Sequence, residues 1–237
     1  MSNLELPPSS SNTLLNLAVP LGAVFAYLGL LVILAEVLSR LLSNDPEITR
    51  KVVHIGSGNV ILLAWWLNIS QTVIVSAAII AAAIALTSYA IPILPSIESV
   101  GRKSFGTLFY AISMGVLTAV FWRTHPQYAV IGILTMAWGD GLAAIVGQRF
   151  GKHKYQVGQI SKSWEGSLAM SVAAFIITSA TLWSVEGNSW QIWLISIATA
   201  VVATACEAFS QLGIDNLTVP LVSGFTGFFS IQALLLK

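Results

Sequence analysis

The sequence predicts an all-α integral membrane protein, a polytopic bundle of about eight transmembrane helices. The 237 residues include 9% charged and 56% hydrophobic residues, with a mean hydropathy of +0.81. A soluble domain has about 25% charged residues. The length of each apolar run is close to the roughly 20 residues that a membrane-spanning helix needs. These runs leave no room for a separate soluble domain.

The expected helices end where charged residues, Gly or Pro interrupt the apolar runs. Arg40 closes the first run and is expected to pair with Glu36 one turn earlier. Arg123 follows the fourth run. The short break at 68–70 separates the second run from the third and predicts a tight helical hairpin. In chain order, the expected helices are 17–42, 52–68, 71–94, 104–122, 128–148, 165–184, 190–209 and 217–236.

The later helices carry start signals. Ser163 can cap the helix expected from 165, with Glu165 in its first turn, where the helix dipole favours a negative charge. Asp215 and Asn216 are typical of a turn and N-cap ahead of the last helix. Residues 17–237 are therefore expected to form one transmembrane domain, after a disordered Pro- and Ser-rich lead at 1–16.

Charge is distributed unevenly between alternate loops. Of the 11 Lys and Arg residues, all except Arg123 and Lys237 fall on one side of the expected membrane. The positive-inside rule makes this side cytosolic and places both termini on the other side. The N-terminus lacks the features of a signal or transit peptide, which favours a bacterial source and an inner or thylakoid membrane. The cationic face is suited to a magnesium–nucleoside triphosphate.

Asp140 lies within a run that otherwise reads as buried in the membrane. An ionisable residue there is expensive and is a functional candidate by default. Small residues recur every four positions around it, at Gly139, Ala143, Gly147 and Gly151, and predict a smooth ridge for helix packing. The hard oxygen atoms of Asp140 suit Mg²⁺, which commonly binds one or two carboxylates and the phosphates of a substrate.

Basic residues at the expected cytosolic face are candidates for phosphate binding. Lys162 precedes a helix N-terminus, a ready anion site, and Glu165 has either a structural or a functional role there. Arg50, Lys51 and His54 follow the pattern R-K-x-x-H, in which Arg50 and His54 share a helix face and can donate charge-assisted hydrogen bonds.

A basic turn, GRKSFGT, spans 101–107 and has the glycine spacing of a P-loop. Thr107 stands where a P-loop has lysine, and no βαβ unit surrounds it, so a P-loop is excluded. Arg102 and Lys103 remain candidate phosphate contacts, as does Lys152. Near the C-terminus, Glu207 lies in an apolar run and is a candidate second metal ligand or base close to Asp140.

The motifs taken together resemble the phytol kinase branch of the polyprenol kinase family, which includes dolichol kinases. They are RKVVH, RKSFGTLFY, GDGLAAIVGQRFGKHKY, KSWEGSLAM and DNLTVPL, in the expected order from Arg50 to Leu221. The resemblance implies a membrane enzyme that uses a nucleoside triphosphate, typically CTP with Mg²⁺, to phosphorylate an isoprenoid alcohol. Phytol is favoured, with geranylgeraniol and farnesol open. The partners implied are this nucleotide, the alcohol and the bilayer, without nucleic acid.

By motif, candidate roles in nucleotide binding, metal binding or catalysis fall on Asp140, Gly141, Gly147, Lys162, Glu165, Asp215 and Asn216. Asp140 and Asp215 are the expected metal ligands, and the catalytic set is completed by Glu207. Either Asp140 or Asp215 is the candidate general base, with His54 a weaker one.

Two alternative functions, a cytidylyltransferase and an ion-coupled transporter, predict different sequence features. The segment 140–166 also resembles phosphatidate cytidylyltransferases, but their C-terminal signature is rich in Lys, Arg and His, and here the segment 207–224 has none of these. A phosphorylated lipid would need cations there, whereas a neutral alcohol would not. An ion-coupled transporter would use Asp140 at mid-membrane, but the polar residues gather at one face and no inverted repeat is present.

Overall fold

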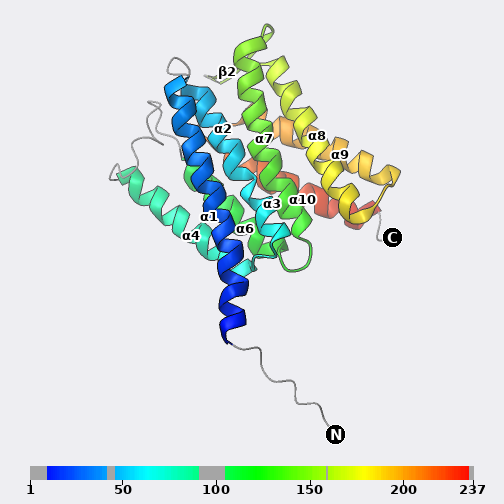
Figure 1. Ribbon diagram of the computed structural model, residues 1–237. Coiled ribbons are helices and arrows are strands. Elements are labelled where there is room, and N and C mark those ends of the chain that lie inside the picture. The colour runs from blue at the N-terminus through cyan, green and yellow to red at the C-terminus, as the bar shows by residue number, and fades with distance from the viewer. Residues whose placement is uncertain (1–9, 42–45, 91–104, 159, 235–237) are drawn as a thin grey trace.

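Helices account for nearly all of the computed structural model, which describes residues 10–41, 46–90, 105–158 and 160–234 (Figure 1). The helices are α1 (Ser10–Leu41), α2 (Pro46–Gly58), α3 (Val60–Trp66), α4 (Gln71–Ala90), α6 (Gly106–Phe121), α7 (Pro126–Phe150), α8 (Trp164–Glu186), α9 (Trp190–Phe209) and α10 (Asp215–Leu234). Strands β1 (Lys154–Val157) and β2 (Ile160–Ser163) form an antiparallel hairpin. The all-α membrane fold class is confirmed.

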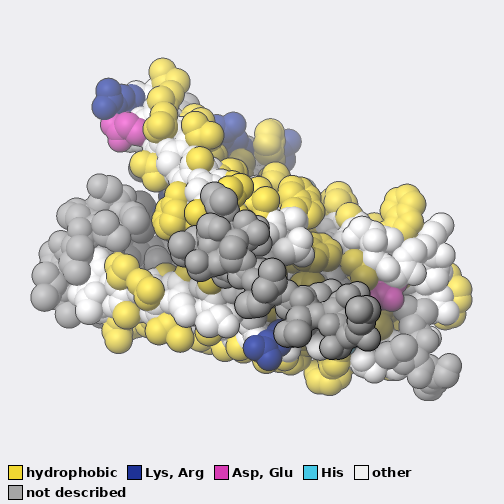
Figure 2. All heavy atoms as spheres, turned by 60° about the horizontal axis from the view of Figure 1, so that its bottom comes forward, with side chains coloured by type: hydrophobic (Ala, Val, Ile, Leu, Met, Phe, Trp, Pro, Cys, Tyr) yellow, Lys and Arg dark blue, Asp and Glu magenta, His cyan; other side chains and the backbone are white. Residues whose placement is uncertain are grey.

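Six helices of the described residues are long and apolar enough to cross a membrane, namely α1, α4, α7, α8, α9 and α10. The other two expected spans take different forms. The span expected at 104–122 is α6, an apolar helix of 16 residues. The span expected at 52–68 is divided between α2 and α3. In the view of Figure 2, hydrophobic side chains are spread over the described surface and charged ones are few. Large apolar side chains such as Phe25, Ile79 and Leu168 are exposed, as a surface in contact with lipid requires.

The start of α2 differs from the sequence expectation. The helix begins at Pro46, ahead of the expected position 52, because Pro is favoured in the first turn and Glu47 complements the helix dipole. Arg50 and Lys51 therefore belong to a helix and not to a loop. The division from α3 falls at Asn59, whose side-chain oxygen accepts a hydrogen bond from the Trp138 indole at 2.8 Å.

Other boundaries also differ from the expectation. Helix α1 begins at Ser10, within the expected lead at 1–16, and residues 1–9 lie outside the described residues. The break at 68–70 is confirmed, with Asn68 in a left-handed conformation at φ 52°. Helix α4 then packs mainly against α6 and not against α2 or α3. This packing is fixed at its start, where the Gln71 amide donates to the carbonyl of Thr118 at 2.9 Å.

Helix α7 is the centre of the bundle and packs against α8, α10, α2 and α6. Residues 128–137 of this helix are buried. The expected small-residue ridge is confirmed. A side chain at Gly139 would meet Met170 of α8, and one at Gly147 would lie 3.0 Å from the Ser163 hydroxyl. These close approaches bring α8 against α7 and fix the position of Asp140 along the axis of the bundle.

The β-hairpin was not foreseen from the sequence. It lies at the end of the bundle where α1 ends, α2 begins, α7 ends and α8 begins, which we call the hairpin end (Figure 1). Tyr155 pairs with Lys162 across the hairpin. Because side chains alternate along a strand, Lys162 points towards the bundle while its neighbour Ser161 is exposed.

Candidate functional site

The first component of the site is an ion pair between α2 and α7. The Lys51 Nζ atom donates a hydrogen bond of 2.6 Å to Oδ2 of Asp140. Only 7% of the Lys51 side chain and 13% of the Asp140 side chain is exposed. The same oxygen lies 3.4 Å from Nε2 of His54, one turn after Lys51 on α2. Asp140 is thus a carboxylate inside the bundle that Lys51 neutralises, with the imidazole of His54 beside it.

Arg50 is oriented differently from Lys51. Its guanidinium forms a two-point interaction with Glu47, at 2.9 Å and 2.5 Å, and half of its side chain is exposed. It remains within electrostatic range of Asp140 and Asp215. The expected pairing of Arg50 and His54 on one face is therefore replaced by Lys51 and His54, which both face Asp140.

The second component is an ion pair between the hairpin and α9. Lys162 Nζ donates to Oε1 of Glu207 at 2.6 Å and also to the backbone carbonyl of Glu207. The exposed fractions of the two side chains are 16% and 8%. The second carboxylate oxygen of Glu207 is buried and has no hydrogen-bond partner among the described residues. Glu207 therefore keeps one oxygen for a ligand.

Asp215 interacts electrostatically with both ion pairs. It is within electrostatic range of Asp140, Lys51 and Lys162. It begins α10, and its Oδ1 atom accepts the backbone N–H of Asn216 at 3.0 Å, so the expected turn at the helix start is confirmed. The Asn216 side-chain oxygen is buried without a hydrogen-bond partner in the described parts of the chain. Two buried oxygen atoms, one of Glu207 and one of Asn216, thus have no partner among the described residues.

Glu165 holds the hairpin to the start of α8. Its carboxylate accepts the backbone N–H of His153 and lies 2.7 Å from Nδ1 of the same residue. The Ser163 hydroxyl accepts the backbone N–H of Gly166 at 3.1 Å, so the expected helix cap is confirmed. These contacts give Glu165 a structural role. Its role in nucleotide binding stays a prediction.

Five further residues were predicted to bind the nucleotide, namely Gly141, Gly147, Lys152, Arg102 and Lys103. Gly141 allows α2 to approach α7, since a side chain there would lie 2.6 Å from Ile55. Gly147 allows α8 to approach in the same way. Lys152 is exposed on the loop between α7 and β1. Arg102 and Lys103 lie outside the described residues, and all these nucleotide-binding assignments stay predictions.

Sequence reasoning identified the charged residues but missed their partners. Lys51 and Asp140 are 89 positions apart, and Lys162 and Glu207 are 45 apart. The helix-spacing rules relate only residues within a few positions of one another, so no local pattern links either pair. Tyr110 was also missed, although its ring packs 5.9 Å from that of His54.

Comparison with known proteins identifies the family of the chain. It is 51% identical to "Phytol kinase" of Synechocystis sp. over 88% of this chain and 90% of that protein. It is 31% identical to "Phytol kinase 1, chloroplastic" of Arabidopsis thaliana, over 93% of this chain and 79% of that protein. A probable phytol kinase 2 of rice is 30% identical over 94% and 78%. No protein-family model and no solved structure matches the chain. The chain belongs to the phytol kinase family.

Proposed function

We propose that this protein transfers the γ-phosphoryl group of CTP to the hydroxyl group of phytol. The relatives named as phytol kinases support the substrate and the reaction. The observation that carries the proposal is the presence of two buried ion pairs, Lys51–Asp140 and Lys162–Glu207, with Asp215 within electrostatic range of both. Phosphoryl transfer needs little more than cationic groups, carboxylates and precise positioning.

Lys51 and Lys162 supply positive charge that can bind the triphosphate. In the free protein, Lys51 and Lys162 neutralise buried carboxylates, which makes both lysines and acids tolerable in the bundle. A bound triphosphate brings its own negative charge, and the ammonium groups can then donate to phosphate oxygens. Arg50 stands half-exposed close by and adds a guanidinium that can bind two phosphate oxygens at once.

The donor set fits Mg²⁺ bound together with a nucleotide. Among the described residues, no three His, Cys, Asp or Glu side chains could hold a metal ion by themselves. Mg²⁺ does not require such a cage, because it usually binds one or two carboxylates, water and substrate phosphates. Asp140 and Asp215 would hold it, with the unpartnered oxygen of Asn216 close by. When bound, it would neutralise charge on the phosphates.

Asp215 is the better candidate for the proton acceptor. One oxygen of Asp140 is held by Lys51, and one of Glu207 is held by Lys162. In the proposed reaction, the alcohol oxygen forms a bond to the γ-phosphorus while the bond to the bridging oxygen breaks. The hydroxyl proton passes to Asp215, and CDP leaves with the electron pair of the broken bond.

The decisive experiment uses the purified protein in detergent with phytol, Mg²⁺ and CTP labelled at either the α- or the γ-phosphate. Wild type is compared with Asp140→Asn and with Glu36→Gln, which alters an exposed ion pair at 2.8 Å. Transfer of γ-label to the lipid by wild type and Glu36→Gln, and its loss in Asp140→Asn, is the expected result. Transfer of α-label would identify a cytidylyltransferase, and no transfer to any alcohol would overturn the kinase proposal.

A further inference from the structure

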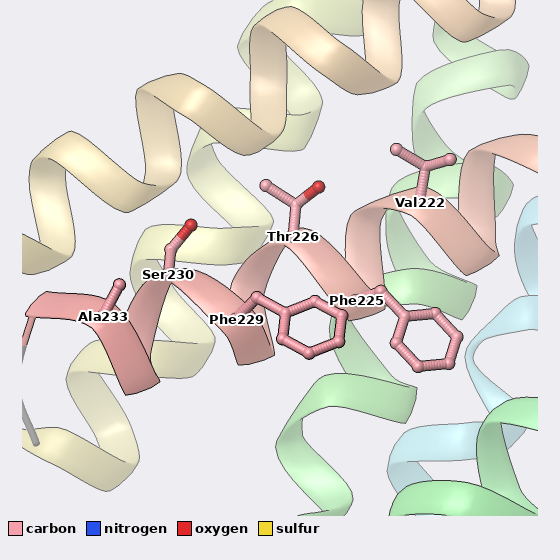
Figure 3. Close-up of a pocket in the computed structure, with 6 residues that line it drawn as sticks. All are labelled: Val222, Phe225, Thr226, Phe229, Ser230 and Ala233. Carbon is pink, nitrogen blue, oxygen red and sulfur yellow. The ribbon is translucent and has the colours of Figure 1, made fainter.

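Two open hollows lie along one face of α10, the first of them also against the end of α9, and we treat them as the two parts of one groove. Its first part, of about 330 Å³, is lined by Ala205, Cys206, Phe209, Ser210, Ile214 and Thr218. Its second part, of about 460 Å³, is lined by Val222, Phe225, Thr226, Phe229, Ser230 and Ala233 (Figure 3). We call the two parts together the α9–α10 groove.

The two parts lie on one face of α10. Thr218, Val222, Phe225 and Phe229 recur every three or four residues, so their side chains line up along the helix. The opposite face is packed, since a side chain at Gly224 would lie 2.8 Å from the backbone of Tyr128 in α7. The groove face is thus turned away from the centre of the bundle, towards lipid.

The first part of the groove is continuous with the site along the chain. Cys206 lines the groove and is followed by Glu207, whose carboxylate binds Lys162. Ile214 lines it and is followed by Asp215. A molecule that enters the groove from the bilayer can therefore present a polar end to these carboxylates while the rest of it stays among apolar side chains.

The second part combines a flat aromatic wall with smaller side chains, against which a branched hydrocarbon can pack. The rings of Phe225 and Phe229 are stacked with an interplanar angle of 21° and a centroid distance of 6.0 Å, which makes a flat wall. Figure 3 shows the smaller side chains of Val222, Thr226 and Ser230 along the other edge of the helix. Thr218 and Ala233 are about 22 Å apart along α10 at 1.5 Å per residue. This length exceeds one leaflet of the hydrocarbon core, about 15 Å.

We propose that the α9–α10 groove holds the hydrocarbon chain of the isoprenoid alcohol. The hydroxyl end lies at Asp215, and the chain follows α10 past Phe225 to Phe229. This assignment rests on the proposed kinase function and adds to it a determinant of chain length. A chain that fills the groove gains contacts along the whole helix face, whereas a short chain leaves the second part to membrane lipid.

The test is to block the second part and compare two alcohols of different length. Thr226→Trp places an indole in the second part of the groove, on the edge of α10 opposite the two Phe rings. The control is Ile80→Trp on α4, where the native side chain is also lipid-facing, with 60% exposed. We expect kcat/KM of Thr226→Trp to fall at least tenfold more for phytol than for geraniol, which has about half the chain. Ile80→Trp should leave this ratio unchanged.

Ser230→Trp blocks the groove one turn further on. It provides an independent test if Thr226→Trp does not fold. It should show the same preference for geraniol, with a smaller loss on phytol. Equal losses on the two alcohols in both variants would overturn the groove assignment. Because wild-type transfer of γ-label is measured in the same experiment, a failure of the kinase proposal is separately visible.

Photolabelling gives a readout that does not depend on catalysis. A phytol analogue with a diazirine at its far end should label residues 222–233 without nucleotide, and excess phytol should suppress the label. A diazirine phospholipid serves as the control for general lipid contact. Labelling spread over α1, α4 and α8 without competition by phytol would show membrane lipid only. Cross-links between two chains through α10 would show a dimer contact. Either result would overturn the proposal.

Discussion

Lys51 of α2 and Asp140 of α7 form a buried ion pair with an Nζ–Oδ2 distance of 2.6 Å. The pair closes the interface between two helices that meet through the small residues Gly58, Ala137 and Gly141. It also holds the intramembrane carboxylate in one position. The energetic consequence is asymmetric, because the loss of one partner leaves the other charge buried and unpaired.

The ion pair predicts the outcome of a double-mutant cycle. Lys51→Met should destabilise the protein by about 3–5 kcal/mol, the usual cost of breaking a buried pair. The double variant Lys51→Met/Asp140→Asn removes both charges and should recover most of the thermal midpoint, but no phosphoryl transfer. Midpoints measured in one detergent would check this. Additive losses in the double variant would show that the two residues do not interact.

Close approach of α2 and α7 depends on Gly58. A side chain there would collide with Ala137, so Gly58→Ala should cost about 1–3 kcal/mol and move Lys51 away from Asp140. Activity should fall with stability. Gly22→Ala in α1 is the matched control, since nothing lies within 4 Å of that position. The double change Gly58→Ala/Ala137→Gly should restore both properties, and a failure to do so would contradict the packing explanation.

The Lys162–Glu207 pair predicts a difference between two substitutions. Glu207→Gln keeps an oxygen that can accept from Lys162 and should retain the hairpin, while Glu207→Leu removes it. Amide hydrogen exchange over residues 152–163 should rise at least tenfold in Glu207→Leu and little in Glu207→Gln. Equal exchange in both variants would mean that the backbone contact of Lys162 alone holds the hairpin.

The proposed metal ligands predict a change in magnesium dependence. Removal of Mg²⁺ with a chelator should abolish phosphoryl transfer, and added Mg²⁺ should restore it. Asp215→Asn should lower kcat, because it removes the proposed proton acceptor, and should raise the Mg²⁺ concentration for half-maximal residual activity at least tenfold, because it removes one negative ligand. Glu47→Gln changes an acid that binds only Arg50 in the described structure and should leave that concentration nearly unchanged. The same shift in both variants would rule out a specific role for Asp215.

The distribution of Lys and Arg predicts the orientation in the membrane. In a Cys206→Ser background, a cysteine at exposed Ser161 of the hairpin should be protected from an impermeant maleimide in intact cells. A cysteine at exposed Asn188, between α8 and α9, should be labelled. The reverse pattern would place the hairpin end outside the cytosol and contradict the positive-inside assignment.

The sequence by itself determined the membrane fold class and singled out Asp140 as a candidate functional residue. Composition and run length suffice for the first, because hydrocarbon admits only apolar segments with internally bonded backbones. A carboxylate in such a segment is energetically costly unless it has a function or a partner. Asp140 could be singled out for this reason. The small-residue ridge around it could also be predicted, since helix periodicity is a local property.

Only the tertiary structure decided which groups neutralise one another. Lys51 pairs with Asp140, and Lys162 pairs with Glu207, because α2 begins earlier than expected and because an unforeseen hairpin points Lys162 into the bundle. Asp215, at the start of α10, comes within electrostatic range of both pairs. The strength of an ion pair depends on distance and burial. Both are set by helices that meet far apart in the chain, so no local pattern could supply them.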